Sequence, residues 1–399
     1  MKNVVIFDSV RTAIGKLGGT IKDVQVDHLA STVLKELVKR TGIEKSIVDE
    51  VIMGHAKQSA DFPNFARVAL LRAEFPIEVA GYTVQRNCGS GLQAINNGAQ
   101  QIMCGLNDVV IAGGAESMST APFYLRNIRY GLGVGNTELL DSNTESQARA
   151  QPIDMFGNYG MGVTAENLAE QYNISRSEQD EFALRSQENA KNAIKNGLFA
   201  DQIVAVEVKQ KKGEPIKFNV DEHPRETSFE KLSTLKPVFK ENGTVTAGNS
   251  SGRNDGAGAV LLMDEEAAKR YGKKPKARII SQAVAGVRPE IMGIGPAPAT
   301  RKALQQAGLK LEDIGLIELN EAFAAQSLAV IKELELDINK VNVNGGAIAL
   351  GHPIGGTGAI IMTKLLHEME RRGEKYGLAT LCIGGGIGIS TIVENLQVE

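Results

Sequence analysis

The sequence predicts an α/β fold made of two similar halves, each a parallel or mixed sheet covered by helices on both faces. The first observation is that short β-branched runs alternate with amphipathic helical periods near both ends of the chain, a pattern typical of such sheets. The second is that a helix, a strand and a glycine run follow one another at residues 92–114 and again at 360–386. The third is a polar, irregular stretch at residues 119–246, which indicates an insertion or excursion rather than more of the same sheet.

The first half is expected to alternate strands with helices from its beginning. Apolar periodicity places its elements as follows: strands at 4–7, 48–53, 82–85 and 108–112, and helices at 29–38, 65–72 and 92–103. Gly42 is expected to end the first helix. Gly113 and Gly114 are expected to end the last strand.

The insertion and the second half are predicted in the same way. Helices are expected at 165–172 and 177–196, the second capped by Ser177 with Asp180. Strand character returns at 255–263. The later elements are expected as follows: strands at 278–284, 315–319 and 378–382, and helices at 300–307 and 322–334, with another after Thr357.

Composition excludes several classes of function. The 399 residues are 42% hydrophobic and 23% charged, as in globular proteins. A net charge of −3 gives no electrostatic reason to expect nucleic acid or an anionic membrane as partner. The cysteines Cys88, Cys104 and Cys382 are too few for a disulfide framework and lack metal-ligand spacing. Without a signal-peptide pattern or a long apolar run, the expected location is the cytoplasm.

A glycine-rich run, NVNGGAIALGHPIGGTG at 342–358, holds His352 and no other charged or titratable residue. Glycines let backbone approach a ligand or another backbone closely, and the helix after Thr357 offers free N–H donors at its start. The run therefore indicates either a loop that presents His352 to a ligand or a tight turn with a buried histidine.

Cys88 lies in the Asn-Cys-Gly-Ser-Gly turn between a predicted strand and helix. A helix N-terminus stabilises a thiolate, so the pKa of Cys88 is expected to be lowered. Cys382 precedes a glycine run whose N–H groups could form an oxyanion hole, although a core cysteine fits equally. Asn320 could cap the following helix or hold a water or a carbonyl, and the role of His55 at a strand end stays open.

Two cysteines and a histidine at strand ends fit one particular chemistry. One thiolate would accept an acyl group with histidine as its base, and the second cysteine would act as acid and base toward a carbon acid. A hydrolase needs no second cysteine, whereas an acyltransferase that forms carbon–carbon bonds does.

Long motifs in order then carry a resemblance to the thiolase family. They are CGSG at 88–91, GGAESMS at 113–119, TAGNSSG at 246–252, NEAFAAQ at 320–326, NVNGGAIALGHPIG at 342–355 and CIGGG at 382–386. The resemblance implies the thiolase fold, two βαβαβαββ halves stacked in five layers. It implies an N-terminal half at 1–118 and 251–271, a loop domain at 119–250 for CoA binding and tetramerisation, and a C-terminal half at 272–399.

The resemblance also implies the residues of the site. Cys88 would carry the acyl group, His352 would activate the Cys88 thiol, and Asn320 would hold a water. Cys382 would move the α-proton, and the N–H groups of Cys88 and Gly384 would form the oxyanion hole. The implied CoA contacts are Met161, Arg225, Phe239, Ser251 and Phe323. Neither a metal nor a resident cofactor is expected, since CoA and acyl-CoA are substrates.

The implied activity is that of an acetyl-CoA C-acetyltransferase, which interconverts two acetyl-CoA with acetoacetyl-CoA and CoA. The alternative is a degradative 3-ketoacyl-CoA thiolase with longer acyl substrates, because Gly160 stands where many short-chain members have histidine. Cys382 argues against a ketoacyl-synthase-like enzyme, and the complete catalytic set argues against a non-catalytic lipid-binding protein. The resemblance further implies fatty acid metabolism and a homo-oligomer, either a dimer or a homotetramer formed through residues 124–141.

Overall fold

The computed structural model describes residues 2–272 and 274–398. Its N-terminal half contains the following elements: β1 (Val4–Thr12), β2 (Gly15–Lys16), α1 (Val26–Thr41), β3 (Glu50–Gly54), α2 (Phe65–Arg72), β4 (Ala80–Val84), α3 (Ser90–Met103), β5 (Val109–Ser117) and, after the insertion, β11 (Asn254–Asp264) and α9 (Glu265–Ala268). The predicted order of strands and helices in this half is confirmed, with most elements longer than expected.

The C-terminal half repeats this order. Its elements are β12 (Ala277–Gly286), α10 (Pro296–Ala307), β13 (Leu316–Leu319), α11 (Ala324–Leu334), α12 (Ala347–Leu350), α13 (Thr357–Arg372), β14 (Tyr376–Ile383) and β15 (Ile387–Asn395). Short 3-10 turns at Lys45–Ile47, Lys269–Tyr271, Pro289–Ile294, Leu311–Asp313 and Ile338–Lys340 join some of them. The strand β15 has no counterpart among the predicted elements.

Strand pairing confirms the duplication. In the first half the strands run β4-β3-β5-β11-β1, with β3 parallel to both neighbours and β11 antiparallel to both. In the second half a bridge at Val341 is followed by β13-β14-β15-β12, with the same sequence of parallel and antiparallel pairings. The two sheets join where Val5 and Ile6 of β1 pair with β12.

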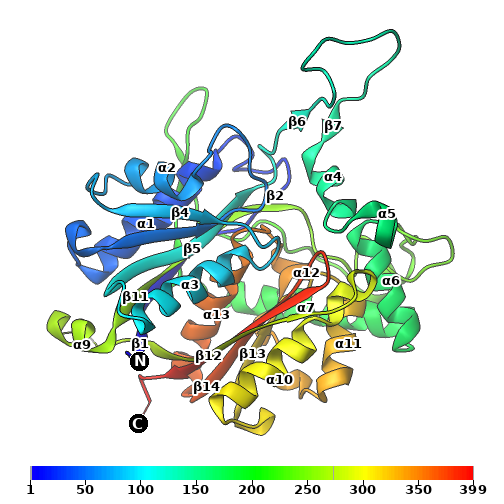
Figure 1. Ribbon diagram of the computed structural model, residues 1–399. Coiled ribbons are helices and arrows are strands. Elements are labelled where there is room, and N and C mark those ends of the chain that lie inside the picture. The colour runs from blue at the N-terminus through cyan, green and yellow to red at the C-terminus, as the bar shows by residue number, and fades with distance from the viewer. Residues whose placement is uncertain (1, 273, 399) are drawn as a thin grey trace.

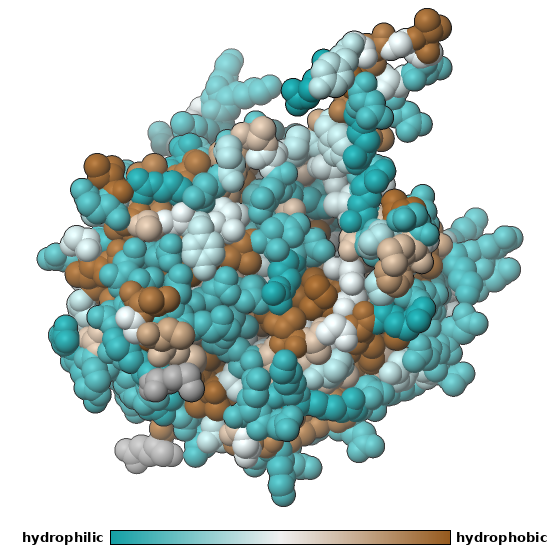
Figure 2. Space-filling view, in the orientation of Figure 1, coloured by the Kyte–Doolittle hydropathy of each residue, from teal (hydrophilic) through white to brown (hydrophobic). Residues whose placement is uncertain are grey.

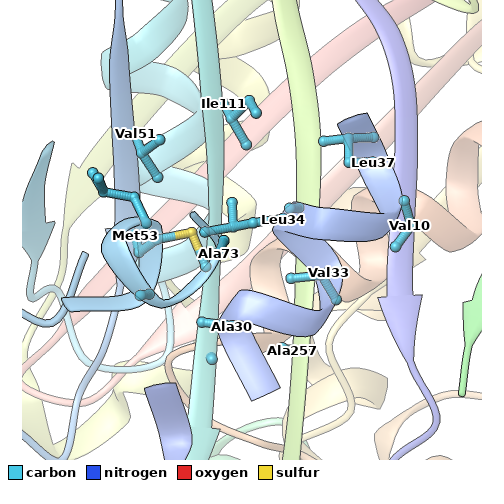
Figure 3. Close-up of a cluster of buried hydrophobic side chains, with 14 of the residues drawn as sticks. Val10, Ala30, Val33, Leu34, Leu37, Val51, Met53, Ala73, Ile111 and Ala257 are labelled. Atoms are coloured by element: carbon cyan, nitrogen blue, oxygen red, sulfur yellow. The ribbon is translucent and has the colours of Figure 1, made fainter. Parts of the chain in front are cut away.

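The halves stack as five layers (Figure 1). The helices α1 and α2 pack on the outer face of the first sheet, and Figure 3 shows Val33, Leu34 and Leu37 of α1 against this sheet. The helices α3 and α13 lie side by side between the two sheets. The helices α10 and α11 cover the outer face of the second sheet. This arrangement buries α3 and α13 at the centre of the molecule.

The insertion is less regular and covers one end of the sheets. It contains β6 (Phe123–Tyr124), β7 (Leu140–Asp141), α4 (Ser142–Ala148), α5 (Ile153–Phe156), α6 (Met161–Gln171), α7 (Arg176–Lys195), β8 (Ile203–Val204), β9 (Val206–Val208), β10 (Ile216–Phe218) and α8 (Phe229–Ser233). The segment between β6 and β7 projects well beyond the body (Figure 1).

Two sequence-based expectations about these elements are wrong. β5 runs through Gly113 and Gly114 to Ser117, because these residues permit close backbone contact rather than a chain break. A Cβ on Gly113 would lie 2.1 Å from the Gly258 carbonyl oxygen. The capping box of α7 is formed by Ser175 and Glu178, and the helix begins at Arg176. The expected capping pair, Ser177 and Asp180, therefore lies inside the helix.

A buried ion pair fastens the insertion to the first strand. The Arg11 guanidinium donates to both carboxylate oxygens of Asp221, at 2.8 and 2.9 Å, and to Gln202 Oε1 at 2.7 Å. Both side chains of the ion pair are fully buried. Asp221 also accepts from the Ile14 N–H at 2.8 Å, so one carboxylate joins β1 and the loop after it to the insertion.

Replacing Asp221 by asparagine is expected to destabilise the fold by about 3–5 kcal/mol, because it leaves the Arg11 charge buried without its partner. Urea unfolding followed by circular dichroism measures the change. Glu74→Gln removes the exposed pair with Lys35 and should leave the urea midpoint unchanged. Equal midpoints for all three proteins would contradict this account of the ion pair.

Candidate active site

Cys88 and His352 occupy equivalent places in the two halves. Cys88 lies in the turn between β4 and α3, and His352 lies in the loop between the Val341 bridge and α13. The start of α3 lies in close contact with the residues just before α13, because a Cβ on Gly91 would lie 2.8 Å from the Gly355 carbonyl oxygen. A Cβ on Gly114 of β5 would lie only 2.1 Å from the same oxygen. Glycines at these positions therefore let the two loops come together at the centre of the molecule.

Both side chains face a cavity of about 1070 Å³, measured with its open mouth. Its wall is formed by residues of both halves and of the insertion: Ala56, Lys57, Gln85, Asn87, Cys88, Met118, Asn143, Ser146, Gln147, Ala150, Met161, Phe239, Ser250, Ser251, Gly252, Arg253, Met292, Ala322, Phe323, His352, Ile354 and Gly384. The cavity therefore combines Cys88, His352 and Gly384 with four of the five expected CoA contacts.

The Cys88 sulfur is held beside two backbone donors. The backbone N–H groups of Gly384 and of Cys88 itself lie close enough to the sulfur to favour its thiolate form. Asn87 adopts a left-handed conformation, with φ of 44°, and its Nδ2 donates to the Gly384 carbonyl at 3.0 Å. This contact fixes the Cys88 turn against the glycine run after β14. The two N–H groups are therefore positioned as a pair beside the sulfur.

The expected lowering of the Cys88 pKa is wrong for this structure. Burial raises the pKa of the thiol, and this outweighs the opposing effects of the Gly384 N–H and the Lys57 charge. The helix N-terminus alone does not overcome the removal of the sulfur from water. Cys88 consequently needs a base to take its proton.

His352 is arranged as that base. Thr357 Oγ1 donates to the Pro353 carbonyl at 2.9 Å and lies 2.7 Å from His352 Nδ1. Since the hydroxyl proton is committed to Pro353, Nδ1 carries the imidazole proton and donates to Thr357. Among the described residues Nε2 has no hydrogen-bond partner. Burial lowers the pKa of His352 to about 4, so the ring is neutral with a free lone pair on Nε2.

The loss of the Thr357 hydroxyl in Thr357→Val is expected to lower kcat/KM about tenfold. The reason is that a buried Nδ1–H left without its acceptor disfavours the active tautomer by about 1–1.5 kcal/mol. Steady-state rates across pH check this, because the wild type should keep its histidine neutral down to pH 5. Thr357→Ser should recover most of the rate. A serine variant as slow as the valine variant would show that packing, not the hydroxyl, matters.

Cys382 lies one residue before the end of β14 and is fully buried. It belongs to an apolar cluster with Met161, Met292 and Phe323. Burial, and then the nearby Cys88, raise the pKa of Cys382. The resting side chain is therefore a thiol with a proton to give, close enough to Cys88 for their charges to interact.

Asn320 does not cap a helix, which corrects one of the two readings of the sequence. The helix α11 begins at Ala324 with Phe323 at its N-cap. Both polar atoms of the Asn320 amide are buried and have no partner among the described residues. Buried polar groups are normally hydrogen-bonded, so this amide is available to a small polar group. It lines a second, smaller space with Gly351 and Pro353.

Glu116 and His55 form a buried ion pair beneath the His352 loop, at 2.7 Å. Burial favours the neutral forms, but the ion pair and the backbone hydrogen bonds together outweigh it, so the pKa of Glu116 is lowered and that of His55 is raised. Glu116 also accepts from the N–H groups of Ala56, Lys57 and Gly355, at 3.1, 3.2 and 2.9 Å. This carboxylate thus binds the His352 loop to the end of β3, which explains the histidine left open by the sequence.

Met161, Phe239, Ser251 and Phe323 line the cavity, whereas Arg225 does not. The rings of Phe239 and Phe323 meet edge to face with centroids 6.0 Å apart. The exposed Arg225 donates instead to the Ala247 carbonyl at 3.3 Å. One end of the cavity is therefore apolar and aromatic.

The space beside Gly160 is occupied by a neighbouring side chain. A Cβ at this position would lie 3.2 Å from Gln147 Oε1, and Gln147 is part of the cavity wall. The sequence did not single out Gln147, Lys57 or Thr357. Lys57 and Gln147 come close to Cys88 and His352 through contacts between distant segments, whereas Thr357 lies only five residues after His352.

In residues 2–272 and 274–398, no helix is long and apolar enough to cross a bilayer. The same residues contain no cluster of three or more side chains suited to binding a metal ion.

Comparison with known proteins gives consistent matches over almost the whole chain. The family models "Thiolase, N-terminal domain" and "Thiolase, C-terminal domain" match residues 4–266 and 273–395. Acetyl-CoA acetyltransferase of Pseudomonas aeruginosa is 51% identical over 391 residues, 98% of each chain.

Two solved structures match as well. The crystal structure of Bacillus anthracis acetyl-CoA acetyltransferase has a TM-score of 0.96 at 52% identity, covering 99% of each chain. Human mitochondrial 3-ketoacyl-CoA thiolase in complex with CoA has a TM-score of 0.94 at 46% identity, covering 99% of this chain and 98% of that one. The duplicated five-layer fold, the central Cys88–His352 cavity and these matches together establish that the chain belongs to the thiolase family.

Proposed function

We propose that the protein is an acetyl-CoA C-acetyltransferase, an acyltransferase that interconverts two acetyl-CoA with acetoacetyl-CoA and CoA. The observation that carries this function is the joining of Cys88, two N–H donors and a neutral histidine in one cavity, with a second, protonated cysteine beside them. Relatives named acetyl-CoA acetyltransferase support the choice of substrate.

In the first half-reaction Cys88 is acylated. His352 Nε2 takes the thiol proton as the sulfur attacks the thioester carbonyl of acetyl-CoA. The negative oxygen accepts from the N–H groups of Cys88 and Gly384. When the carbon–sulfur bond to CoA breaks, the imidazolium returns the proton to the departing CoA sulfur. The products are acetyl-Cys88 and CoA.

In the second half-reaction a new carbon–carbon bond forms. His352, neutral again, takes the proton of the Cys382 thiol, and the resulting thiolate removes a proton from the methyl group of a second acetyl-CoA. Its raised pKa makes it a strong base for a carbon acid. The thioester oxygen of this substrate is stabilised by His352 and by a water on Asn320. The enolate carbon attacks acetyl-Cys88, the Cys88 sulfur leaves and takes the proton back from His352, and acetoacetyl-CoA is released. Thiolysis is the reverse, with Cys382 protonating the departing enolate.

The CoA moiety would lie against the aromatic end of the cavity and the loop domain at 119–250. Met161, Phe239, Ser251 and Phe323 would contact its pantetheine arm, and Arg225 would contact it outside the cavity. No metal or resident cofactor takes part in these steps.

Assembly into a homotetramer is part of the proposal. The strand β4 is an edge of the first sheet, so it offers unpaired backbone groups to a second copy. The projecting segment between β6 and β7 carries large apolar side chains that are exposed, and its tip is partly brown in Figure 2. They are Leu125, Ile128, Tyr130, Leu132, Val134 and Leu139, and Phe123 of β6 is exposed as well. Light scattering should show a smaller particle after residues 125–139 are replaced by a short linker.

The second candidate is a degradative 3-ketoacyl-CoA thiolase, supported by the structural match to the human mitochondrial enzyme. Initial rates of CoA-dependent thiolysis on acetoacetyl-CoA and on a long-chain 3-ketoacyl-CoA separate the two. A strong preference for acetoacetyl-CoA supports the short-chain enzyme, and equal or better rates on the long substrate support the degradative one. We place either activity in the cytoplasm and in fatty acid metabolism, to be tested by cell fractionation and by growth of a deletion strain on fatty acids.

A further inference from the structure

Lys57 is a buried cation in the wall of the acyl cavity. It lies three residues after the end of β3 and only 9% of its surface is exposed. It lines the same cavity as Cys88 and His352, and its charge interacts with Cys88. The wall contains one other cation, Arg253, and no carboxylate among the described residues, so burial of the Lys57 ammonium group costs free energy that no anion of the wall offsets.

The immediate partners of Lys57 are neutral. Its Nζ donates to Ser146 Oγ and lies 3.5 Å from the Ser142 carbonyl oxygen. No carboxylate of the described residues lies within 4.0 Å of Nζ. Asn143 Oδ1, which belongs to another residue of the cavity wall, is buried and has no hydrogen-bond partner among the described residues.

The charged groups around Lys57 do not replace a partner. Glu116 attracts it, but this carboxylate is already held by His55 and three N–H groups. Arg253 repels it, and Asp141 pairs with Arg253 at 3.5 Å. Burial is the main reason that the pKa of Lys57 is lowered. A buried ammonium whose hydrogen-bond partners are all neutral is stabilised by any anion that enters the cavity beside it.

We propose that Lys57 binds a carboxylate at the far end of the acyl group, so that the enzyme also acts on 3-oxodicarboxylic acyl-CoA thioesters. This inference rests on the proposed thiolase reaction. In thiolysis Cys88 attacks C3, the C2–C3 bond breaks, and Cys382 protonates the acetyl-CoA enolate. The ω-carboxyacyl group on Cys88 then passes to the sulfur of CoA. The products are acetyl-CoA and the CoA thioester of a shorter dicarboxylic acid.

A different role for Lys57 would be to stabilise the Cys88 thiolate. Stabilisation of the thiolate does not depend on the acyl group of the substrate, so it would affect the rates of all substrates equally. Recognition of a carboxylate affects only substrates that carry one. The ratio of rates for a matched pair of substrates therefore separates the two.

The experiment compares kcat/KM for thiolysis of 3-oxohexanoyl-CoA and 3-oxohexanedioyl-CoA, which differ only in the terminal carboxylate. We expect the wild type to favour the dicarboxylic substrate and Lys57→Met to lower the dioyl-to-monoacyl ratio at least about 30-fold. Lys57→Arg should keep most of the preference. Lys35→Met, on the exposed side of α1, is the matched control and should keep the wild-type ratio.

Acetoacetyl-CoA, tested in parallel, keeps failure of this inference apart from failure of the proposed function. A wild type active on acetoacetyl-CoA but without preference for the dioyl substrate overturns the inference and leaves the thiolase function standing. An equal loss on both six-carbon substrates in Lys57→Met also overturns it, in favour of thiolate stabilisation. Inactivity of the wild type on every substrate overturns both.

Discussion

Replacing Cys88 by alanine is expected to lower thiolysis of acetoacetyl-CoA by at least about 10⁴-fold, because the acyl group then has no acceptor. The two N–H groups and His352 remain, but they stabilise only an intermediate in which the Cys88 sulfur is bonded to the acyl carbon. Initial rates with purified protein, read at the thioester absorbance, measure the loss.

Cys104 provides the control for this substitution. It lies exposed at the C-terminal end of α3, the helix that begins after Cys88. Cys104→Ala should therefore keep wild-type activity. Full activity of Cys88→Ala would contradict the assignment of the nucleophile, and loss of activity in Cys104→Ala would point to disturbance of α3 instead.

Replacing Cys382 by alanine is expected to separate the two half-reactions. Condensation and thiolysis should fall by about 10²–10⁴-fold, the usual contribution of a general acid or base. Acetyl transfer from acetyl-CoA to Cys88 should continue, since it uses His352 and the two N–H groups. Exchange of labelled CoA into acetyl-CoA measures this transfer without the carbon–carbon step.

His352→Asn is the comparison variant, and it should lose the exchange and the condensation together. Its role in both half-reactions follows from the free Nε2. If Cys382→Ala also lost the exchange reaction, Cys382 would be acting on Cys88 itself rather than on the α-proton.

Periodicity predicted the order of strands and helices because each element shows one face to a core. It could not reveal that α3 and α13 lie together at the centre, since this depends on glycines whose importance is visible only where backbones meet. Gly114 is the clearest example. As a sequence signal it indicated the end of a strand, and in the fold it lets the His352 loop reach β5.

The site residues could be chosen from motifs, but their protonation could not. The position of Cys88 before a helix suggested a lowered pKa, whereas its burial raises it. The tautomer of His352 depends on one hydroxyl, that of Thr357, which the sequence alone did not indicate. Lys57 was missed because a single lysine after a strand does not indicate a functional role in the sequence. Its place in the cavity wall is visible only in the folded chain.

The most direct test of the account is to find where acetyl-CoA leaves its acetyl group. The protein would be incubated with radiolabelled acetyl-CoA, quenched in acid and digested, and the labelled peptide identified by mass spectrometry. We predict one acetyl group per chain, on the peptide that contains Cys88, and its release on addition of CoA. Label on Cys382 or on another residue, or no label with an enzyme that turns over, would contradict the central role of Cys88.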